Sequence, residues 1–358
     1  MRRLVAIPLA ALCGLNCAML ARREGSPPDW LSFMLSGQAA ASGLNAYGEL
    51  TITKGPNLNP PISLLVFAPL SQLDWSLCLS VWRVCSMLLL VVALSLLARS
   101  EGIRLPPLAL LWALSMAGTW TVLEQGQVHT LLLMLTVGAW MLLQRSRLLP
   151  AGVLIGLLVA IKPNFLVWPA LLFLSGYWLP AGVAIATALL ASVIPAILYG
   201  PAIYLDWYVV HHVYYTPERI GWPVNTSFIG LATRYDLPAL GYVAAFLLLA
   251  SLAVWAVKCR PDLRSVSSAA LVASLLASPI AWVSYTVLLL PLFVRLRWSP
   301  LLVAAAVLLA VPSWLVWSVP TLGLYYNLAL LPLLSIAVRV SRLTAPASEA
   351  PVSTASRP

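Results

Sequence analysis

Charged residues are scarce in this sequence, and their scarcity excludes an ordinary soluble protein. Only 9% of the 358 residues are charged and 61% are hydrophobic, whereas soluble domains carry about 25% charged residues. The mean hydropathy is +0.93. A chain can cross a bilayer only as helices or as a closed barrel, and the long apolar runs here lack strand-like alternation. We therefore predict an all-α, polytopic membrane protein.

Cysteine pairs and metal-binding motifs are also missing. The five cysteines lie inside apolar runs or, for Cys259, among basic residues, so they form neither a disulfide framework nor a C-x-x-C metal site. The sequence contains no D-x-D pair. Two histidines, His211 and His212, are adjacent and would point about 100° apart on a helix, which disfavours shared binding of one metal ion. We expect these two and His129 to be packing residues.

Twelve apolar runs are candidate membrane spans. The first follows the basic start of the chain and resembles a secretory signal, but the runs after it favour a retained helix with a cytoplasmic N-terminus. Two short runs meet at Lys162-Pro163 and another ends before Arg295, so we predict ten to twelve spans, some of them broken. The runs are residues 4–20, 76–98, 105–123, 128–143, 148–161, 165–178, 181–199, 239–257, 266–281, 285–294, 300–319 and 322–338.

The basic residues are distributed unevenly between the connecting loops. Alternation of the spans places most of them on one side, which the positive-inside rule identifies as the cytoplasm. Most acids fall on the other side. The net charge of +10 therefore reflects orientation rather than nucleic-acid binding. The basic residues assigned to the cytoplasm are Arg2, Arg3, Arg99, Arg104, Arg145, Arg147, Lys258, Arg260, Arg264, Arg295, Arg297, Arg339, Arg342 and Arg357.

Two long polar segments interrupt the apolar runs, and loops carried by apolar helices are where we expect the chemistry. Residues 22–74 and 200–238 are both predicted to lie outside the cell, and the second is rich in Tyr, Trp and His, which suits a membrane interface or a sugar-like ligand. Residues 1–343 are predicted to form one membrane-embedded domain. The tail, residues 344–358, is rich in Pro, Ser and Ala and is predicted to be disordered in the cytoplasm.

Five blocks occur in this order along the chain: PPDWLSFMLSGQAAASGLNAYG, NPPISLLVFAPLSQL, EQGQVHTLLLMLTVGAWMLLQRSRLLPAGVLIGLLVAIKPNFLVWPALLF, NTSFIGLATR and LLASPIAWVSYTVLLLPLF. Together they resemble the conserved blocks of glycosyltransferase family 87, over roughly residues 1 to 340. The resemblance implies the GT-C fold. It also implies a bacterial inner-membrane enzyme that moves mannose from a polyprenyl-phosphate donor to a lipid- or glycan-linked acceptor at the periplasmic face. One departure is that family members commonly carry His just after the S-P-x-x-W block, where this chain has Val283-Ser284-Tyr285.

The resemblance places Asp29 at the position of the family's catalytic aspartate. An inverting transfer needs one base for the acceptor hydroxyl and a cation or donor for the leaving phosphate, so one acid suffices and no metal or other cofactor is expected. The apolar residues after Asp29 are expected to lie on the membrane; they are Trp30, Leu31, Phe33, Met34 and Leu35. The alternative for Asp29 is capping of that helix.

Lys162 ends a span on the outer side, where an ammonium group suits a lipid phosphate. Its alternative is an interfacial lysine that snorkels. Arg83 lies about two turns into its span, so it either pairs with a buried acid or faces the phosphate. Glu124 and Gln127 are candidates for binding sugar hydroxyls, or they simply form a turn.

Asn225 and Tyr285 stand in two of the five blocks and are candidate substrate contacts. Either Tyr285 or Lys162 would then compensate for the missing family histidine.

Two other classes of function fit a polytopic helical chain. A lipid or solute transporter would place polar residues near the middle of the membrane, often in repeated halves, whereas the ionisable groups here sit at span ends, apart from Arg83, and no internal repeat is visible. A catalytically degenerate relative is the second alternative, because the family histidine is missing. No local motif distinguishes mannose, glucose and arabinofuranose as the donor sugar, or identifies the acceptor.

Overall fold

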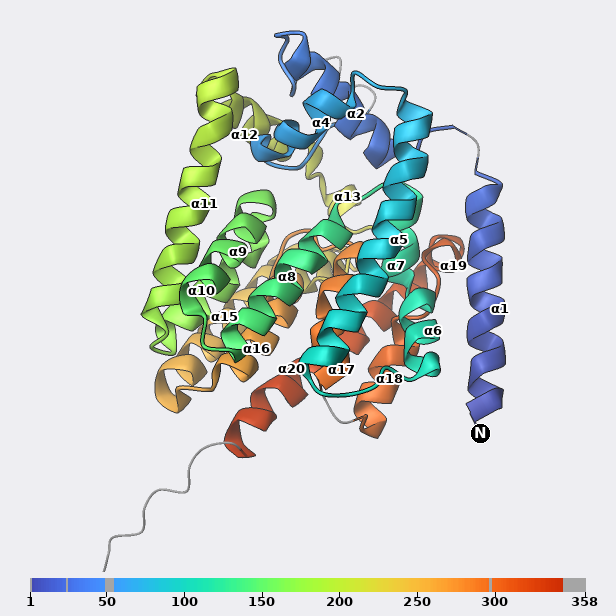
Figure 1. The fold of residues 1–358 in the computed structure, drawn as a ribbon, viewed down its shortest axis with the longest axis vertical. Helices are drawn as coiled ribbons and strands as arrows, with labels where there is room; N and C mark the ends of the chain where they lie inside the picture. Colours follow the sequence, from blue (N-terminus) through green and yellow to red (C-terminus); the bar gives the residue numbers. More distant parts are fainter. Residues whose placement is uncertain (1, 24, 49–54, 296–297, 344–358) are drawn as a thin grey trace, which may run out of the picture.

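The computed structural model describes residues 2–23, 25–48, 55–295 and 298–343, and this part of the chain is helical without a strand. Four helices have the length and apolar character needed to cross a membrane: α5 (Trp75–Ser100), α11 (Trp178–Tyr199), α15 (Pro238–Cys259) and α20 (Leu324–Leu343), the last counted from residue 320 to 339. Seven apolar segments are shorter, and one of them belongs to α1 (Arg2–Ala21), which stands at one side of the molecule in Figure 1. The prediction of an all-α, polytopic membrane fold is confirmed.

Two of the expected spans are each divided into two helices. The run at 105–123 forms α6 (Pro107–Ser115) and α7 (Ala117–Gln125), because Met116 has an extended ψ of 137°. The run at 300–319 forms α18 (Pro300–Leu308) and α19 (Ser313–Ser318). A hydrogen bond joins the two breaks: the backbone amide of Ala117, at the first break, donates to the carbonyl of Leu309, at the second, at 2.9 Å. Some spans were predicted to be broken, and these two runs are broken, although the sequence pointed to the junction at Lys162-Pro163 and to the run before Arg295 instead.

The centre of the molecule is made of short, buried helices. All residues of α16 (Leu263–Leu276) from Ser265 onward are buried, and α16 packs against α20 and against α10 (Val167–Leu174). A 3₁₀ segment, η3 (Val283–Leu289), leads into α17 (Leu290–Arg295). Two further helices, α8 (His129–Gln144) and α9 (Leu148–Ile161), pack together, and η2 (Pro163–Leu166) follows α9 after Lys162. These elements form the floor below the two polar segments.

The first polar segment carries α2 (Pro28–Ala41), η1 (Pro61–Ser63) and α4 (Leu64–Leu70). The second carries α12 (Ala202–Tyr214), α13 (Pro217–Ile220) and α14 (Phe228–Thr233). In Figure 1, α2, α4 and α12 lie together at one end of the molecule. The predicted tail, residues 344–358, lies outside the described residues.

Helix α2 is packed into the protein rather than laid on the membrane. Gly37 lets α2 approach α4 closely, because a Cβ atom at this position would lie 2.2 Å from the carbonyl oxygen of Phe67. The rings of Trp30 and Phe33 contact Phe67, with centroids 6.1 and 4.7 Å apart. The expectation that this apolar stretch lies on the membrane is wrong for its buried members, which are Trp30, Phe33, Met34 and Leu35. This packing holds the first turn of α2 in place.

Candidate active site

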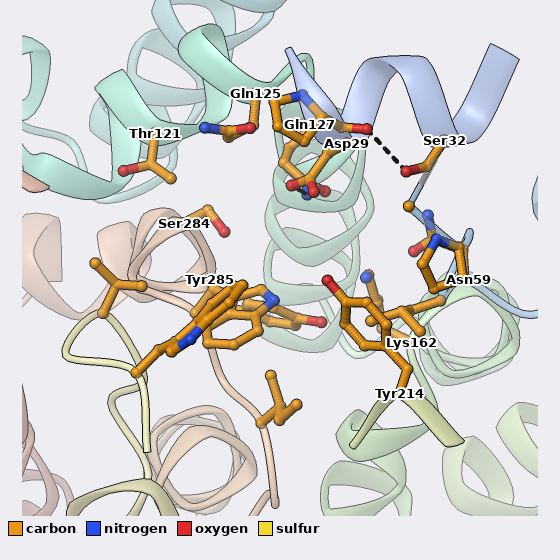
Figure 2. Close-up of a pocket in the computed structure, with 18 of the residues that line it drawn as sticks. Asp29, Ser32, Asn59, Thr121, Gln125, Gln127, Lys162, Tyr214, Ser284 and Tyr285 are labelled. Carbon is orange, nitrogen blue, oxygen red and sulfur yellow. Dashed lines mark hydrogen bonds between the residues drawn. The ribbon is translucent and has the colours of Figure 1, made fainter. Parts of the chain in front are cut away.

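A cavity of about 670 Å³ lies beneath the two polar segments. Its walls come from α2, α7, η2, α12, η3 and α19, so it gathers segments from most of the chain. Five of the seven predicted site residues line it: Asp29, Glu124, Gln127, Lys162 and Tyr285. Figure 2 shows how four of these residues, Asp29, Gln127, Lys162 and Tyr285, lie around the same space. The structure thus brings together residues that are more than 250 positions apart in the sequence.

The carboxylate of Asp29 is aimed at the cavity from the first turn of α2. The N-cap of this helix is Pro27, and no side-chain capping bond is formed there. Oδ2 of Asp29 instead accepts a hydrogen bond from the side-chain amide nitrogen, Nε2, of Gln127. Burial raises the pKa of Asp29, while the bond from Gln127 and the positive charges of Lys162 and Arg23 oppose that shift. Asp29 is therefore a stronger base than an exposed aspartate, and it is held in one orientation.

Gln127 itself has unused hydrogen-bonding capacity. It follows Gly126, whose φ of 67° ends α7 in the left-handed region, and Trp30 packs so closely on this glycine that an added Cβ would lie 2.9 Å from its ring. The buried Oε1 of Gln127 has no partner among the described residues. An acceptor atom buried at the wall of a cavity is a site for a ligand hydroxyl.

Lys162 lies at the C-terminal end of α9, where φ −138° and ψ 89° turn the chain into η2. Its Nζ lies 5.1 Å from the centre of the Tyr285 ring. Burial lowers the pKa of Lys162 to about 8, and the charge of Asp29 opposes the shift. Lys162 forms no salt bridge within the part of the chain that the structure describes, so its ammonium group is available to an anion in the cavity.

Tyr285 is fixed from two sides. The ring of His129 meets it edge-on with centroids 4.3 Å apart, and the ring of Phe165 lies 6.2 Å away in a stacked arrangement. His129 is buried and both of its ring nitrogens lack a partner among the described residues. The neighbouring Ser284 also lines the cavity, and its buried hydroxyl has no hydrogen-bond partner among the described residues.

Glu124 and Arg83 belong to one charged cluster at the end of α7. Glu124 lines the cavity and forms a salt bridge with Arg23. Arg83 does not line the cavity: its Nε donates to the carbonyl of Leu123 at 2.9 Å and its Nη2 to the carbonyl of Glu124 at 3.4 Å. Arg83 thus satisfies the last carbonyls of a helix, and the contacts it makes are with backbone rather than with a buried acid.

Asn225 does not line the cavity either. Its Nδ2 donates to the carbonyls of Ile220 and Pro279 at 2.9 and 3.0 Å, and its Oδ1 accepts from the amides of Ser227 and Ala281 at 3.2 and 3.0 Å. These four bonds use all of its hydrogen-bonding groups. Asn225 therefore ties the N-T-S block to the S-P-x-x-W block and has no group left for a substrate.

The second polar segment supplies further cavity residues, and one of them, His211, was expected from the sequence to be a packing residue only. Trp207, His211, Tyr214 and Tyr215 of this segment line the cavity. The Nε2 of His211 lies 3.0 Å from the Tyr215 hydroxyl, and its ring lies 4.6 Å from that of Trp207. For Trp207, Tyr214 and Tyr215 the aromatic composition of residues 200–238 was the only signal, and it did not select individual residues. Within the described residues, no three His, Cys, Asp or Glu side chains converge as a metal site would require.

Arg23 and Asn59 were also missed. Both line the cavity, and the buried Oδ1 of Asn59 has no partner among the described residues. Arg23 is recognisable only as a basic residue at the end of the first helix, whereas Asn59 stands in a proline-rich stretch with no distinguishing pattern.

A comparison with protein families matches residues 57–279 to the model of glycosyltransferase family 87. The matched segment contains Glu124, Gln127, Lys162 and Asn225, whereas Asp29 and Tyr285 lie outside it. No curated protein and no solved structure matches the chain.

Proposed function

Because the chain belongs to glycosyltransferase family 87, a family of membrane glycosyltransferases, we propose that it moves a sugar from a polyprenyl-phosphate donor to a hydroxyl of a lipid- or glycan-linked acceptor. We propose mannose as the donor sugar. The observation that carries this proposal is the placement of a carboxylate, Asp29, and an ammonium group, Lys162, on the wall of one cavity among partnerless hydrogen-bonding groups. A carboxylate, a cation and hydroxyl-binding groups are what transfer of a phosphate-linked sugar requires.

In the proposed reaction Asp29 is the general base. It takes the proton of the acceptor hydroxyl as the acceptor oxygen attacks the anomeric carbon from the face opposite the phosphate. The bond between that carbon and the phosphate oxygen breaks, and the electron pair leaves on the polyprenyl phosphate. The configuration of the anomeric carbon is inverted. Gln127 orients Asp29 through its amide nitrogen and offers Oε1 to a sugar hydroxyl.

The leaving phosphate is proposed to lie beside Lys162 and the Tyr285 hydroxyl. These two groups would take over the role of the histidine that this chain lacks after the S-P-x-x-W block. The reaction as proposed needs no metal ion, because Lys162 supplies the positive charge that stabilises the phosphate. Glu124, which also lines the cavity, remains a candidate for binding a sugar hydroxyl.

The function is tested by incubating the purified protein with radiolabelled polyprenyl-phosphate sugars and an extract of membrane lipids as acceptor. We expect label to move into a new lipid-soluble product from the mannose donor, and not from a nucleotide-linked mannose. Uptake of the labelled lipid into vesicles without formation of a product would instead indicate a transporter. Transfer from the glucose or arabinofuranose donor alone would correct the donor sugar.

The asymmetry of the basic residues supports an orientation in the bacterial inner membrane with the cavity on the periplasmic side. In a cysteine-free version of the protein, single cysteines at Ser42 and Thr216 are expected to react with an impermeant maleimide in intact cells. Cysteines at Ser100 and Ser146 serve as matched controls and are expected to react only after lysis. Labelling of the second pair in intact cells would reverse the orientation.

A further inference from the structure

The end of α12 carries a tyrosine that the proposed reaction does not use. Tyr214 is the last residue of this helix, it is half-buried, and it lines the cavity. Figure 2 shows its ring pointing from the second polar segment into the space that Asp29, Lys162 and Tyr285 surround. The hydroxyl of Tyr214 forms no hydrogen bond with a described residue. A phenolic hydroxyl in a cavity without a protein partner is free to bond to a ligand.

The backbone around Tyr214 is fixed by contacts on both sides of it. The indole nitrogen of Trp207, about two turns earlier on α12, donates to the carbonyl of Leu58 at 3.2 Å and so joins this helix to the first polar segment. After α12 ends, the hydroxyl of Thr216 caps α13 by accepting a hydrogen bond from the amide of Arg219 at 3.5 Å. This short connection brings the side chain of Arg219 back over the end of α12.

Arg219 lies directly on the ring of Tyr214. Its guanidinium carbon is 3.5 Å from the ring centre, and its Nη1 donates to the carbonyl of Tyr214 at 3.4 Å. Arg219 does not itself line the cavity. It forms no salt bridge within the described ranges of the chain, so no acid is paired with its charge. A cation over the face of an aromatic ring is attracted to it, so Arg219 both holds the ring and keeps a positive charge beside it.

The charges around Tyr214 make its hydroxyl a donor suited to an anion. Burial raises the pKa of Tyr214, the charge of Arg219 opposes that shift, and the charge of Asp29 reinforces it. The hydroxyl therefore keeps its proton at neutral pH and can donate it in a hydrogen bond. The positive charge beside the ring strengthens this donor, and hydrogen bonds to a charged acceptor are stronger than those to a neutral one. A phosphate oxygen thus suits Tyr214 better than a sugar hydroxyl does.

We propose that Tyr214 binds the donor phosphate together with Lys162 and Tyr285, and that Arg219 is a positioning residue that acts through Tyr214; this inference rests on the proposed function. The three phosphate contacts come from α12, from the end of α9 and from η3. As the bond to the anomeric carbon breaks, negative charge develops on the phosphate, and the Tyr214 hydroxyl would stabilise that charge. Donor binding would then connect the second polar segment to the floor of the cavity.

Binding of farnesyl phosphate to the purified protein in neutral detergent, measured by isothermal titration calorimetry, tests the Tyr214 contact without any chemical step. Tyr214→Phe removes only the hydroxyl and is expected to weaken binding about tenfold, the effect of losing a hydrogen bond to a charged group. Tyr208→Phe is the matched control, because Tyr208 lies on the same helix and is 62% exposed; this change should leave binding unaltered. Farnesol has the same chain without the phosphate, so it should bind equally to the wild type and to Tyr214→Phe.

A double-mutant cycle tests the positioning role of Arg219. Arg219→Gln is expected to weaken the binding of farnesyl phosphate about threefold, because it removes the cation from the ring. If Arg219 acts through the hydroxyl, adding Arg219→Gln to Tyr214→Phe should weaken binding no further. Arg219→Lys retains a positive charge and is expected to bind farnesyl phosphate more tightly than Arg219→Gln does. An equal loss from Arg219→Gln in both backgrounds would contradict action through Tyr214.

The same measurements separate this inference from the proposed function. If the wild type binds farnesyl phosphate no better than farnesol, the prenyl-phosphate donor is overturned, and the role of Tyr214 with it. If the wild type prefers farnesyl phosphate and Tyr214→Phe binds it equally well, only the assignment of Tyr214 is wrong. Normal binding of farnesyl phosphate by Tyr214→Phe, with a raised KM for the sugar-carrying donor, would place Tyr214 at the sugar and overturn the phosphate contact.

Discussion

Replacing Asp29 by asparagine is expected to lower the turnover number by about 10²-fold or more, the usual contribution of a general base. An amide cannot take the proton of the acceptor hydroxyl, although it keeps the shape of the side chain and can still bond to Gln127. The apparent KM for the donor should change little. Thermal stability at neutral pH should not fall, because burial raises the pKa of Asp29 and so destabilises the folded state once the carboxyl ionises. Initial rates over a range of donor concentrations, with a melting curve for each variant, measure these effects.

Asp236→Asn is the matched control for this substitution. Asp236 is exposed on the second polar segment and has a φ of 58°, a conformation that asparagine adopts readily. Its replacement should leave turnover within about twofold of the wild type. If Asp29→Asn turns over normally while Glu124→Gln is inactive, the base has been assigned to the wrong acid. If neither change affects turnover, the proposed mechanism is lost.

Replacing Lys162 by methionine is expected to raise the apparent KM for the polyprenyl-phosphate donor, with a loss of about 1.5 to 3 kcal/mol for one charge-assisted hydrogen bond. Methionine fills similar space without the charge. A pH series gives a second readout, because the pKa of Lys162 is lowered to about 8. The ammonium form is present below that pH and is lost above it, so the donor KM of the wild type should rise above about pH 8.

The same pH series separates a phosphate contact from a snorkelling lysine. In Lys162→Met the donor KM should be high at every pH and should lose its rise above about pH 8. Arg104→Gln, which removes a positive charge from an exposed loop, should retain the wild-type profile. A donor KM for Lys162→Met equal to that of the wild type would return Lys162 to the interfacial role.

Hydropathy and charge predict the helical membrane fold and the two polar segments, because both patterns are local. The break between α6 and α7 could not be predicted in this way. The helix is interrupted at Met116, where the backbone amide of Ala117 donates to the carbonyl of Leu309. That partner lies almost two hundred residues away in the sequence. Similarly, Trp30 is recognisable as apolar, but only the fold shows that Phe67 and Trp82 cover it in place of lipid.

The lining of the cavity was predicted in part, for related reasons. Asp29 and Lys162 stand out as charges in a chain with few of them, and the fold places both on one cavity. The sequence could not show that Gln127 orients Asp29, because the two are 98 positions apart. A position in one of the five family-like blocks did not distinguish a substrate contact from a structural residue. Asn225 stands in such a block, but its side chain bonds only to the backbone. Two other acids of the first polar segment, Glu24 and Glu49, lie outside the described residues.

The pH dependence of the turnover number, measured side by side for the wild type and Asp29→Asn with saturating substrates, tests the assignment of the base most directly. A base must be deprotonated to act, and the pKa of Asp29 is raised above the ordinary value of 3.8. The wild-type turnover number is therefore expected to fall about tenfold per pH unit on the acid side of a midpoint above that value. The low residual turnover of Asp29→Asn should not show this fall. An identical acid limb in both proteins would contradict the assignment of Asp29 as the base.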